Sequence, residues 1–316
     1  MGGEFDFIHN IKTKYGLTKV GDDCAVLPKD AETDLLITAD LLVEDVDFRL
    51  EWTMPELLGH KALAVSLSDI AAMGGEPESG LLSIGVPEKI WNSGFLPRFY
   101  DGWYTLAKRF GVELVGGDVS RTPDRLVIDS IVLGTVEKGS AVFRTGASPG
   151  DIIFVTGKLG GAAGGLRLLE SGRADASGAE SNGLLRRQLK PEPKVLLGRL
   201  LREDGLASSM IDISDGLSSD LRHICEASLV GARIDASCIP IEVDLADNFD
   251  HRTALELSLN GGEDFELLFT VPREKLSLLR NGEFSEIGVV TENAGNIELF
   301  LDGKLIDLPA GGYRHF

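Results

Sequence analysis

The first 140 residues alternate short apolar runs with longer stretches that are partly polar. The short runs have the length of strands, and the longer stretches place apolar residues three to four positions apart, as helices do. On this pattern we predict strands at 35–38, 81–86, 112–115 and 126–136, with helices over 54–73 and 91–110. Alternating strands and helices are typical of α/β and α+β proteins.

The helix over 54–73 carries the sharpest boundary signals in this half. Thr53-Met54-Pro55-Glu56 is typical of a capping box with proline in the first turn. Gly74-Gly75 follows the last apolar positions and predicts the end of the helix. Asp69 lies inside this helix between Leu67 and Ile70, an unusual setting for a solvated charge.

A segment rich in glycine, serine and proline, residues 138–150, predicts a boundary between two domains, 1–140 and 150–316. Beyond it we predict strands at 152–156, 209–213, 265–270, 286–290 and 297–301, and helices near 194–203 and 216–228. A glycine-rich loop at 157–165 enters a further helix, and residues 171–183 are expected to form an exposed excursion. The predicted class is therefore α/β (α+β) in two domains.

Composition narrows the classes of partner. The length of 316 residues suits two domains, and 43% hydrophobic with 26% charged residues is ordinary for a globular protein. The formal net charge is −19. Such a surface repels nucleic acid and free nucleotides alike, because binding phosphates requires positive charge. We expect no nucleic-acid partner, and any polyphosphate ligand must bind together with cations.

Cysteine usage and the start of the chain bear on location. Cys24, Cys225 and Cys238 form no CxxC pair, which favours small buried residues in a reducing compartment over a disulfide framework. Glu4 and Asp6 come where a signal peptide would be basic and then apolar, and no apolar run has the length of a membrane span. We expect a cytoplasmic protein without membrane attachment.

Aspartates recur after apolar runs or at turns, among glycines and other small residues. They form six motifs: Gly21-Asp22-Asp23, Thr38-Ala39-Asp40, Ser68-Asp69, Gly116-Gly117-Asp118, Asp212-Ile213-Ser214-Asp215-Gly216 and Gly261-Gly262-Glu263-Asp264. Mg²⁺ takes oxygen ligands from carboxylates and from substrate phosphates, and glycine lets the backbone approach a ligand closely. The motifs together predict a site for Mg²⁺ and a phosphate compound.

Each motif also has a purely structural interpretation. Asp22-Asp23 suits a turn, Asp69 a solvated helix face, and Ser214 or Asp215 the N-cap of the helix that follows. Residues 261–264 suit a turn before a strand. The recurrence of all six motifs in one chain favours metal binding over these separate interpretations.

Spacing excludes several other phosphate and catalytic motifs. Lys158 lacks the glycine and hydroxyl positions of a Walker A loop, and residues 160–165 lack the Rossmann spacing. We interpret this glycine run as a tight strand-to-helix turn. The HRD and DFG motifs of protein kinases, the HExxH motif and Cys/His zinc spacings do not occur, and the five histidines are scattered.

The same residues carry a resemblance to a known family. The matching stretches are Gly3-Glu4-Phe5, 21–25, 61–65, 67–74, 116–118, 211–217, 261–267 and the ending Gly312-Tyr313-Arg314-His315-Phe316. In this order they resemble thiamine-monophosphate kinases, of the superfamily that includes aminoimidazole ribonucleotide synthetase and selenophosphate synthetase. The resemblance runs nearly end to end, and SDIAAMG, IDISDGL and GGEDFEL are its most specific parts.

The resemblance implies roles for individual residues. Several Mg²⁺ ions would be bound by Asp23, Thr38, Asp40, Asp69, Asp118, Asp212 and Asp215, with Ala39 offering only its backbone carbonyl. ATP would contact Tyr100, Gly117, Asp118, Arg144 and Ser214, and the thiamine moiety would contact Glu263 and Tyr313. The catalytic set would be Asp69, Asp118 and Asp212. The family often has a histidine where this chain has Asp47, which we also expect at the acceptor site.

The implied reaction is direct transfer of the γ-phosphoryl group of ATP to thiamine monophosphate, giving thiamine diphosphate. The acceptor is a phosphate monoester with a second pKa of about 6, so no strong base is required. The resemblance also implies an N-terminal mixed sheet that pairs with a dimer mate, hence a homodimer, and a C-terminal α/β domain that completes the active site.

Three alternatives stay open on the sequence. They are aminoimidazole ribonucleotide synthetase, a non-catalytic sensor of Mg²⁺ and nucleotide, and an acidic structural protein. Selenophosphate synthetase would need a reactive cysteine near the N-terminus, and the only early cysteine is Cys24 inside an aspartate motif. A hydrogenase-maturation relative would need a C-terminal cysteine, which this ending lacks.

Overall fold

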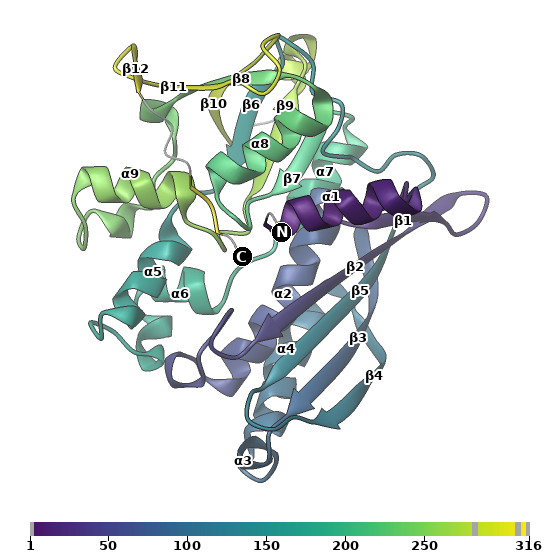
Figure 1. Ribbon diagram of the computed structural model, residues 1–316, viewed down its shortest axis with the longest axis vertical. Helices are drawn as coiled ribbons and strands as arrows, with labels where there is room; N and C mark the ends of the chain where they lie inside the picture. Colours follow the sequence, from purple (N-terminus) through teal and green to yellow (C-terminus); the bar gives the residue numbers. More distant parts are fainter. Residues whose placement is uncertain (1–2, 280–283, 307–310, 314–316) are drawn as a thin grey trace.

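The computed structural model describes residues 3–279, 284–306 and 311–313, with two sheets and the helices packed on them (Figure 1). The end of the chain that contributed to the family resemblance, Arg314-His315-Phe316, lies outside the described residues. The predicted α/β class with a mixed N-terminal sheet is confirmed. Residues 138–150 lie between the last strand of one sheet and the first of the other; the domain limits themselves stay a prediction.

The first sheet has five strands in the order β1-β2-β5-β3-β4. Their bounds are β1 Ala25–Pro28, β2 Thr33–Val43, β3 Glu76–Val86, β4 Glu113–Arg121 and β5 Val127–Glu137. The pair β3–β4 is parallel and the other pairs are antiparallel. Every second residue of β5 is buried, because one face of the sheet is covered by α2 (Pro55–Ala72) and α4 (Phe95–Phe110). Within the described residues, no helix lies over the middle of the opposite face (Figure 1).

The second sheet has seven strands in the order β12-β11-β8-β10-β6-β9-β7. Their bounds are β6 Ile152–Thr156, β7 Ser209–Asp212, β8 Gly231–Asp235, β9 Leu267–Val271, β10 Phe284–Thr291, β11 Ile297–Leu301 and β12 Lys304–Ile306. The helices of this half are α5 Gly161–Glu170, α6 Gly183–Leu189, α7 Val195–Glu203, α8 Leu217–Ser228 and α9 His251–Asn260. Only β8–β11 is a parallel pair in this sheet, within the described residues.

Helix α2 packs against both halves of the chain. Close backbone contacts hold it: a Cβ on Gly102 of α4 would lie 1.9 Å from the carbonyl oxygen of Glu56, and a Cβ on Gly198 of α7 would lie 2.0 Å from that of Ala71. Only glycine fits such crossings, so α4 and α7 can each pack closely against the backbone of α2. Helix α2 is therefore buried almost all round, including its polar residues His60 and Lys61.

Several boundary predictions were wrong. The N-cap of α2 is Met54, with no side-chain cap, and Glu56 instead pairs with Arg98 of α4. The helix expected over 91–110 is divided into α3 (Glu88–Trp91) and α4, since residues 92–94 break the regular pattern and Gly94 has a φ of 74°.

Other elements could not be foreseen from the patterns we used. Helices α1 (Glu4–Tyr15), α6 and α9 and strands β1, β8 and β12 were not predicted. The excursion at 171–183 is not fully exposed, because it forms a 3-10 turn whose Ala176 and Ala179 are buried. Cys24 and Cys225 are buried as expected, but Cys238 is exposed.

Candidate active site

Three carboxylates from distant parts of the chain meet where the two halves join. Asp23 precedes β1, Asp69 lies on α2, and Asp212 ends β7. One oxygen from each lies within 4.8 Å of the others. Asp69 is therefore not the solvated helix-face charge of the structural alternative, and the sequence prediction that these three gather is supported by the geometry.

Burial governs the acidity of this cluster. It raises the pKa of Asp40, on β2, to about 6 and that of Asp212 to about 8, with neighbouring carboxylates adding to both shifts. Burial likewise raises the pKa of Asp69 well above its usual range. The cluster thus holds protons near neutral pH unless cations replace them.

Hydroxyl groups and one guanidinium orient the carboxylates. Ser68 donates to Asp212 over 2.6 Å, Ser66 donates to Asp40 over 2.7 Å, and the Thr38 hydroxyl donates to Asp69. Asp23 accepts from the guanidinium of Arg144 over 2.5 Å. These bonds fix the direction of each carboxylate, and the one from Arg144 is charge-assisted.

The donor set fits Mg²⁺. The ligand atoms of Asp23, Asp69 and Asp212 are all oxygens, the hard donors that Mg²⁺ prefers. Asp23 Oδ2 is buried and has no hydrogen-bond partner among the described residues. The Cys24 thiol beside the cluster has its pKa raised by burial and by the aspartates, so it stays protonated and is a poor ligand. A buried acidic group without a cation is unfavourable, so the arrangement suits a bound divalent ion.

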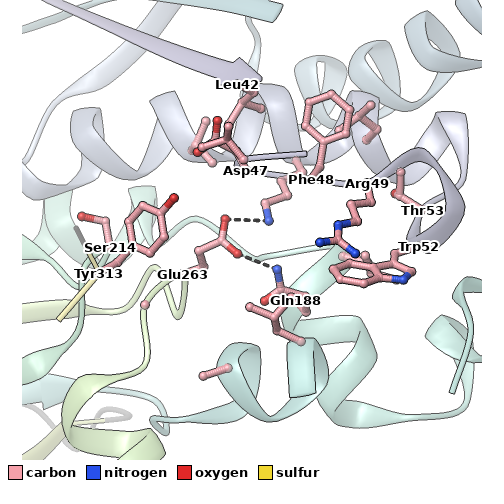
Figure 2. A pocket seen from close by; sticks show the side chains of 18 of the residues that line it. Leu42, Asp47, Phe48, Arg49, Trp52, Thr53, Gln188, Ser214, Glu263 and Tyr313 are labelled. Atoms are coloured by element: carbon pink, nitrogen blue, oxygen red, sulfur yellow. Dashed lines mark hydrogen bonds and ion pairs between the residues drawn. The ribbon is translucent and has the colours of Figure 1, made fainter. Parts of the chain in front are cut away.

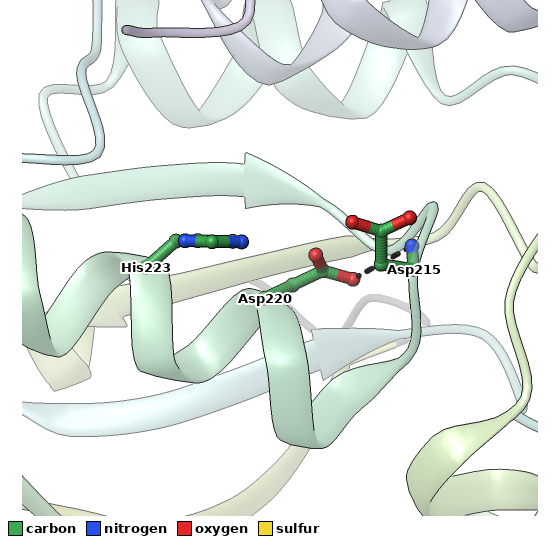
Figure 3. Close-up of side chains that lie close together, drawn as sticks. All are labelled: Asp215, Asp220 and His223. Carbon is green, nitrogen blue, oxygen red and sulfur yellow. Dashed lines mark hydrogen bonds between the residues drawn. The ribbon is translucent and has the colours of Figure 1, made fainter. Parts of the chain in front are cut away.

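Asp215 is held by the start of α8 rather than capping it. The N-cap is Gly216 and makes no side-chain bond, while Asp220 Oδ2 accepts from the backbone N–H groups of Asp215 and Gly216 at 3.2 and 3.0 Å (Figure 3). The N-cap interpretation of Ser214 or Asp215 was wrong for that reason. One carboxylate oxygen of Asp215 lies within 4.8 Å of a ligand atom of Asp220 and of His223. Asp215 also lines, with Ser214, the cavity described next.

A cavity of about 430 Å³ opens beside the cluster, between the two halves of the chain. Its lining includes three of the residues expected at the acceptor: Asp47, Glu263 and Tyr313 (Figure 2). Asp47 Oδ2 also accepts from the backbone N–H of Val43 over 2.8 Å. Asp40 and Asp215 line the same cavity, and the charge of Asp40 acts on Asp69 of the cluster, so the two sites are neighbours.

Three of the expected ligand residues, and the side chain of a fourth, lie apart from this cluster within one chain. Gly117 and Asp118 are on β4, the sheet edge three strands away from β2, which is about 14 Å at the usual strand spacing. Tyr100 is half-buried on α4. Ala39 is exposed on β2, but its backbone lies between those of Thr38 and Asp40, so only its side chain is turned away from the cluster. None of the four lines the cavity.

The backbone N–H groups of the glycine-rich loop at the start of α5 are bound by a side chain of the protein itself. Asp264 accepts from the backbone N–H groups of Gly160 and Ala162 at 2.5 and 3.1 Å. Those N–H groups are thereby unavailable to a phosphate. This agrees with the interpretation of the loop as a tight turn.

Two residues that the sequence did not assign hold Glu263 in place. Lys61 Nζ lies 2.7 Å from Glu263 Oε1, and Gln188 of α6 donates to Glu263 Oε2 over 2.5 Å. Lys61 could have been found from its spacing, because Lys61, Val65 and Asp69 follow one another at four-residue intervals along one face of a helix. Gln188 gave no such signal.

The chain matches known proteins along most of its length. Residues 21–136 match the N-terminal domain, and residues 148–299 the C-terminal domain, of the AIR synthase related proteins. It is 40% identical to a thiamine-monophosphate kinase of Bacillus subtilis (strain 168), over 99% of each chain. The chain belongs to the thiamine-monophosphate kinase family.

Further members of the family show comparable similarity. Identity is 39% to the thiamine-monophosphate kinase of Escherichia coli (strain K12), covering 94% of this chain and 91% of that one. A structure of AaThiL complexed with AMPPCP and TMP is 33% identical and superposes with a TM-score of 0.87, covering 99% of this chain and 97% of that one. None of the helices in the described parts of the chain has the length and apolarity of a bilayer span.

Proposed function

We propose that this protein transfers the γ-phosphoryl group of ATP to thiamine monophosphate, forming thiamine diphosphate, with Mg²⁺ bound by the aspartate cluster. The observation that carries the proposal is that Asp40, whose charge acts on Asp69 of the buried cluster, lines a cavity large enough for a small organic acceptor. Relatives that are 39% and 40% identical are thiamine-monophosphate kinases, and the AaThiL structure is a complex with AMPPCP and TMP.

The residues divide between the two ends of the site. Asp23, Thr38, Asp40, Asp69, Asp212 and Asp215 would hold Mg²⁺, which when bound neutralises and aligns the phosphate groups. Arg144 adds a fixed positive charge at Asp23, where the nucleotide phosphates would lie. Asp47, Glu263 and Tyr313 line the cavity that would hold the thiamine moiety. The acceptor phosphate is largely ionised at neutral pH, so the side chains need only position it.

A homodimer would complete this site. The face of the first sheet opposite α2 and α4 carries half-buried or exposed apolar residues: Leu35, Ile37, Leu41, Leu81, Ile131 and Leu133. Strand β4 is the edge of that sheet and exposes Val115 and Val119 beside Asp118. Pairing this face with a second copy would bury the apolar residues, and Gly117 and Asp118 would then serve the partner's cluster.

The test is product formation from ATP, MgCl₂ and thiamine monophosphate. Wild type should form thiamine diphosphate. Asp212→Asn should lower kcat by at least about a hundredfold, because a metal ligand is lost. Asp204→Asn, an exposed aspartate on the same half, is the matched control and should retain activity. Binding of ATP with Mg²⁺ but no product from thiamine monophosphate would refute the kinase function and favour the sensor. Turnover of the substrate of aminoimidazole ribonucleotide synthetase, in place of thiamine monophosphate, would favour that enzyme.

A further inference from the structure

The centre of the cavity holds a chain of three polar side chains from three different elements. Lys61 comes from α2, Gln188 from α6, and Glu263 from the loop before β9. Lys61 Nζ lies 2.7 Å from one carboxylate oxygen of Glu263, and Gln188 Nε2 lies 2.5 Å from the other (Figure 2). Lys61 and Gln188 are only 3% and 5% exposed. Each oxygen of the Glu263 carboxylate is therefore bound by a buried donor.

The contacts with Lys61 and Gln188 determine what Glu263 can bind. Each of its oxygens already accepts from one donor, and an ionised carboxylate can only accept, so its remaining capacity suits further N–H or O–H donors. The backbone φ of Glu263 is 67°, which is uncommon for a residue other than glycine. The surrounding contacts, including Lys61, must hold this conformation.

Gln188 is oriented by the same contact. Because the carboxylate accepts only, Gln188 turns its NH₂ group toward Glu263, which assigns the other amide atom as the carbonyl oxygen. That oxygen, Oε1, is buried without a hydrogen-bond partner among the described residues. An unpaired buried acceptor is rare. Gln188 also lines the cavity. The last torsion of glutamine is soft, so the amide can rotate to pair this oxygen with a donor bound there.

The surroundings indicate a flat ring. Phe48, Trp52, Leu169 and Leu189 also line the cavity. Lys61 precedes Asp69 by eight residues on the same helix, which is about 12 Å along its axis. An extended thiamine monophosphate spans such a distance, with its phosphate at the carboxylate cluster and its aminopyrimidine ring near Glu263.

We propose that Gln188 determines acceptor specificity: its amide oxygen, beside the carboxylate of Glu263, accepts a hydrogen bond from the amino group of the acceptor's aminopyrimidine. Lys61 is a positioning residue, which acts by holding Glu263. The amide oxygen of Gln188 and the carboxylate of Glu263 are two neighbouring hydrogen-bond acceptors. Together they match an NH₂ group, which has two hydrogens to donate, and they repel a carbonyl oxygen in its place. The inference rests on the proposed function, since it names how the same site selects its substrate.

The test compares two acceptors, thiamine monophosphate and its oxo analogue, oxythiamine monophosphate, in which a carbonyl oxygen replaces the amino group. Wild type should prefer the amino compound in kcat/KM by at least about tenfold. Gln188→Met should raise KM for thiamine monophosphate about three- to tenfold and reduce the preference by a similar factor. KM for ATP should not change. Arg186→Gln, exposed on the same helix, is the control and should behave as wild type.

Lys61 gives a second, independent readout. Lys61→Met should raise KM for thiamine monophosphate more than it lowers kcat, and Lys61→Arg should recover part of the loss because it restores a donor to Glu263. If Lys61 were merely structural, its replacement would lower the amount of folded enzyme and hence the apparent kcat, with KM for thiamine monophosphate unchanged.

The outcomes separate this inference from the proposed function. Wild type that phosphorylates neither compound refutes the kinase function, whereas wild type that phosphorylates both equally well refutes only the role of Gln188. A Gln188→Met enzyme that keeps the wild-type preference also refutes it. If thermal melting shows that Gln188→Met does not fold, Gln188→Asn, whose shorter amide cannot reach both partners, is expected to show the same loss of preference.

Discussion

Aspartates of this chain differ in acidity according to what surrounds them. Asp30 and Asp175 are exposed turn residues, and bonds from backbone or hydroxyl donors lower the pKa of each. Asp40 and Asp212 are buried, and the loss of water raises their pKa to about 6 and about 8. The same residue type therefore marks a turn in one place and a cation site in the other, and burial distinguishes the two.

Mg²⁺ should stabilise the protein more at pH 8 than at pH 6. In the unfolded chain an aspartate ionises near 3.8, whereas Asp40 and Asp212 ionise at about 6 and about 8 in the folded one. Raising the pH through this window forces charge into the metal-free cluster and lowers stability, while it frees ligands for Mg²⁺. The measurement is Tm with and without MgCl₂ at both pH values. An increment in Tm that is equal at the two pH values, or that persists in Asp212→Asn, would contradict the metal assignment.

His60 should make stability fall in acid. Burial lowers its pKa from 6.5 to about 4, and its Nε2 lies 2.8 Å from the carbonyl oxygen of Pro191. The unfolded chain binds a proton that the folded one resists, so the stability present above pH 6.5 is lost as the pH falls toward 4, by up to about 3 kcal/mol.

The check is urea unfolding of wild type and His60→Gln between pH 7 and 4. Glutamine can donate to Pro191 without ionising, so the difference in free energy of unfolding should shrink as the pH falls. The carboxylates contribute equally to both proteins and cancel in this difference. Parallel curves would show that His60 is not the group responsible.

Residues near in sequence were easier to predict than residues that meet only in space. Asp69 and Asp212 could be predicted because each stands in a short motif next to an apolar run. Gln188 could not, because its function depends on Glu263, which is 75 residues away in the chain. Strand β8 was missed because its neighbours in the sheet, β10 and β11, follow it much later in the sequence. Local patterns carry periodicity but not such pairings.

Helix α2 is the element that joins the metal cluster to the acceptor cavity. It contributes Lys61 to the cavity and Asp69 to the cluster, and its serines orient Asp40 and Asp212. The partners of these side chains come from both halves of the chain, so the site depends on the spacing between α2 and the second half. That spacing is set where Gly198 of α7 meets the backbone of α2.

Gly198→Ala should damage catalysis through this spacing. A Cβ there would lie 2.0 Å from the carbonyl oxygen of Ala71, so α7 and α2 must move apart. A displacement of about 1 Å between Asp69 and Asp212 is expected to lower kcat about a hundredfold, and overpacking to cost about 1–3 kcal/mol of stability. Kinetics and thermal melting of Gly198→Ala test this. Leu196→Ala, on the exposed face of the same helix, is the control, and equal effects of the two variants would contradict the argument.

At the scale of the whole molecule, one chain does not gather all the residues that the family resemblance implies. The cluster and cavity lie between its two halves, but Asp118 lies on the far edge of the first sheet. The net charge of −19 would oppose association of two copies unless an apolar surface drives it. The face of that sheet opposite α2 and α4 offers such a surface, which is why we propose that the complete site requires two copies.

Subunit complementation decides whether Asp118 serves the partner's site. Asp118→Asn and Asp212→Asn should each be inactive alone. If Asp118 acts across the proposed dimer, a mixed dimer has one site with both residues intact and one site with neither. Random reassociation of equal amounts makes half of the dimers mixed, so the mixture should recover about a quarter of wild-type activity. If Asp118 acted within its own chain, every site would lack one residue and the mixture would stay inactive. A mixture of Asp212→Asn with Asp69→Asn is the matched control. Both of those residues belong to the cluster of one chain, so it should recover nothing.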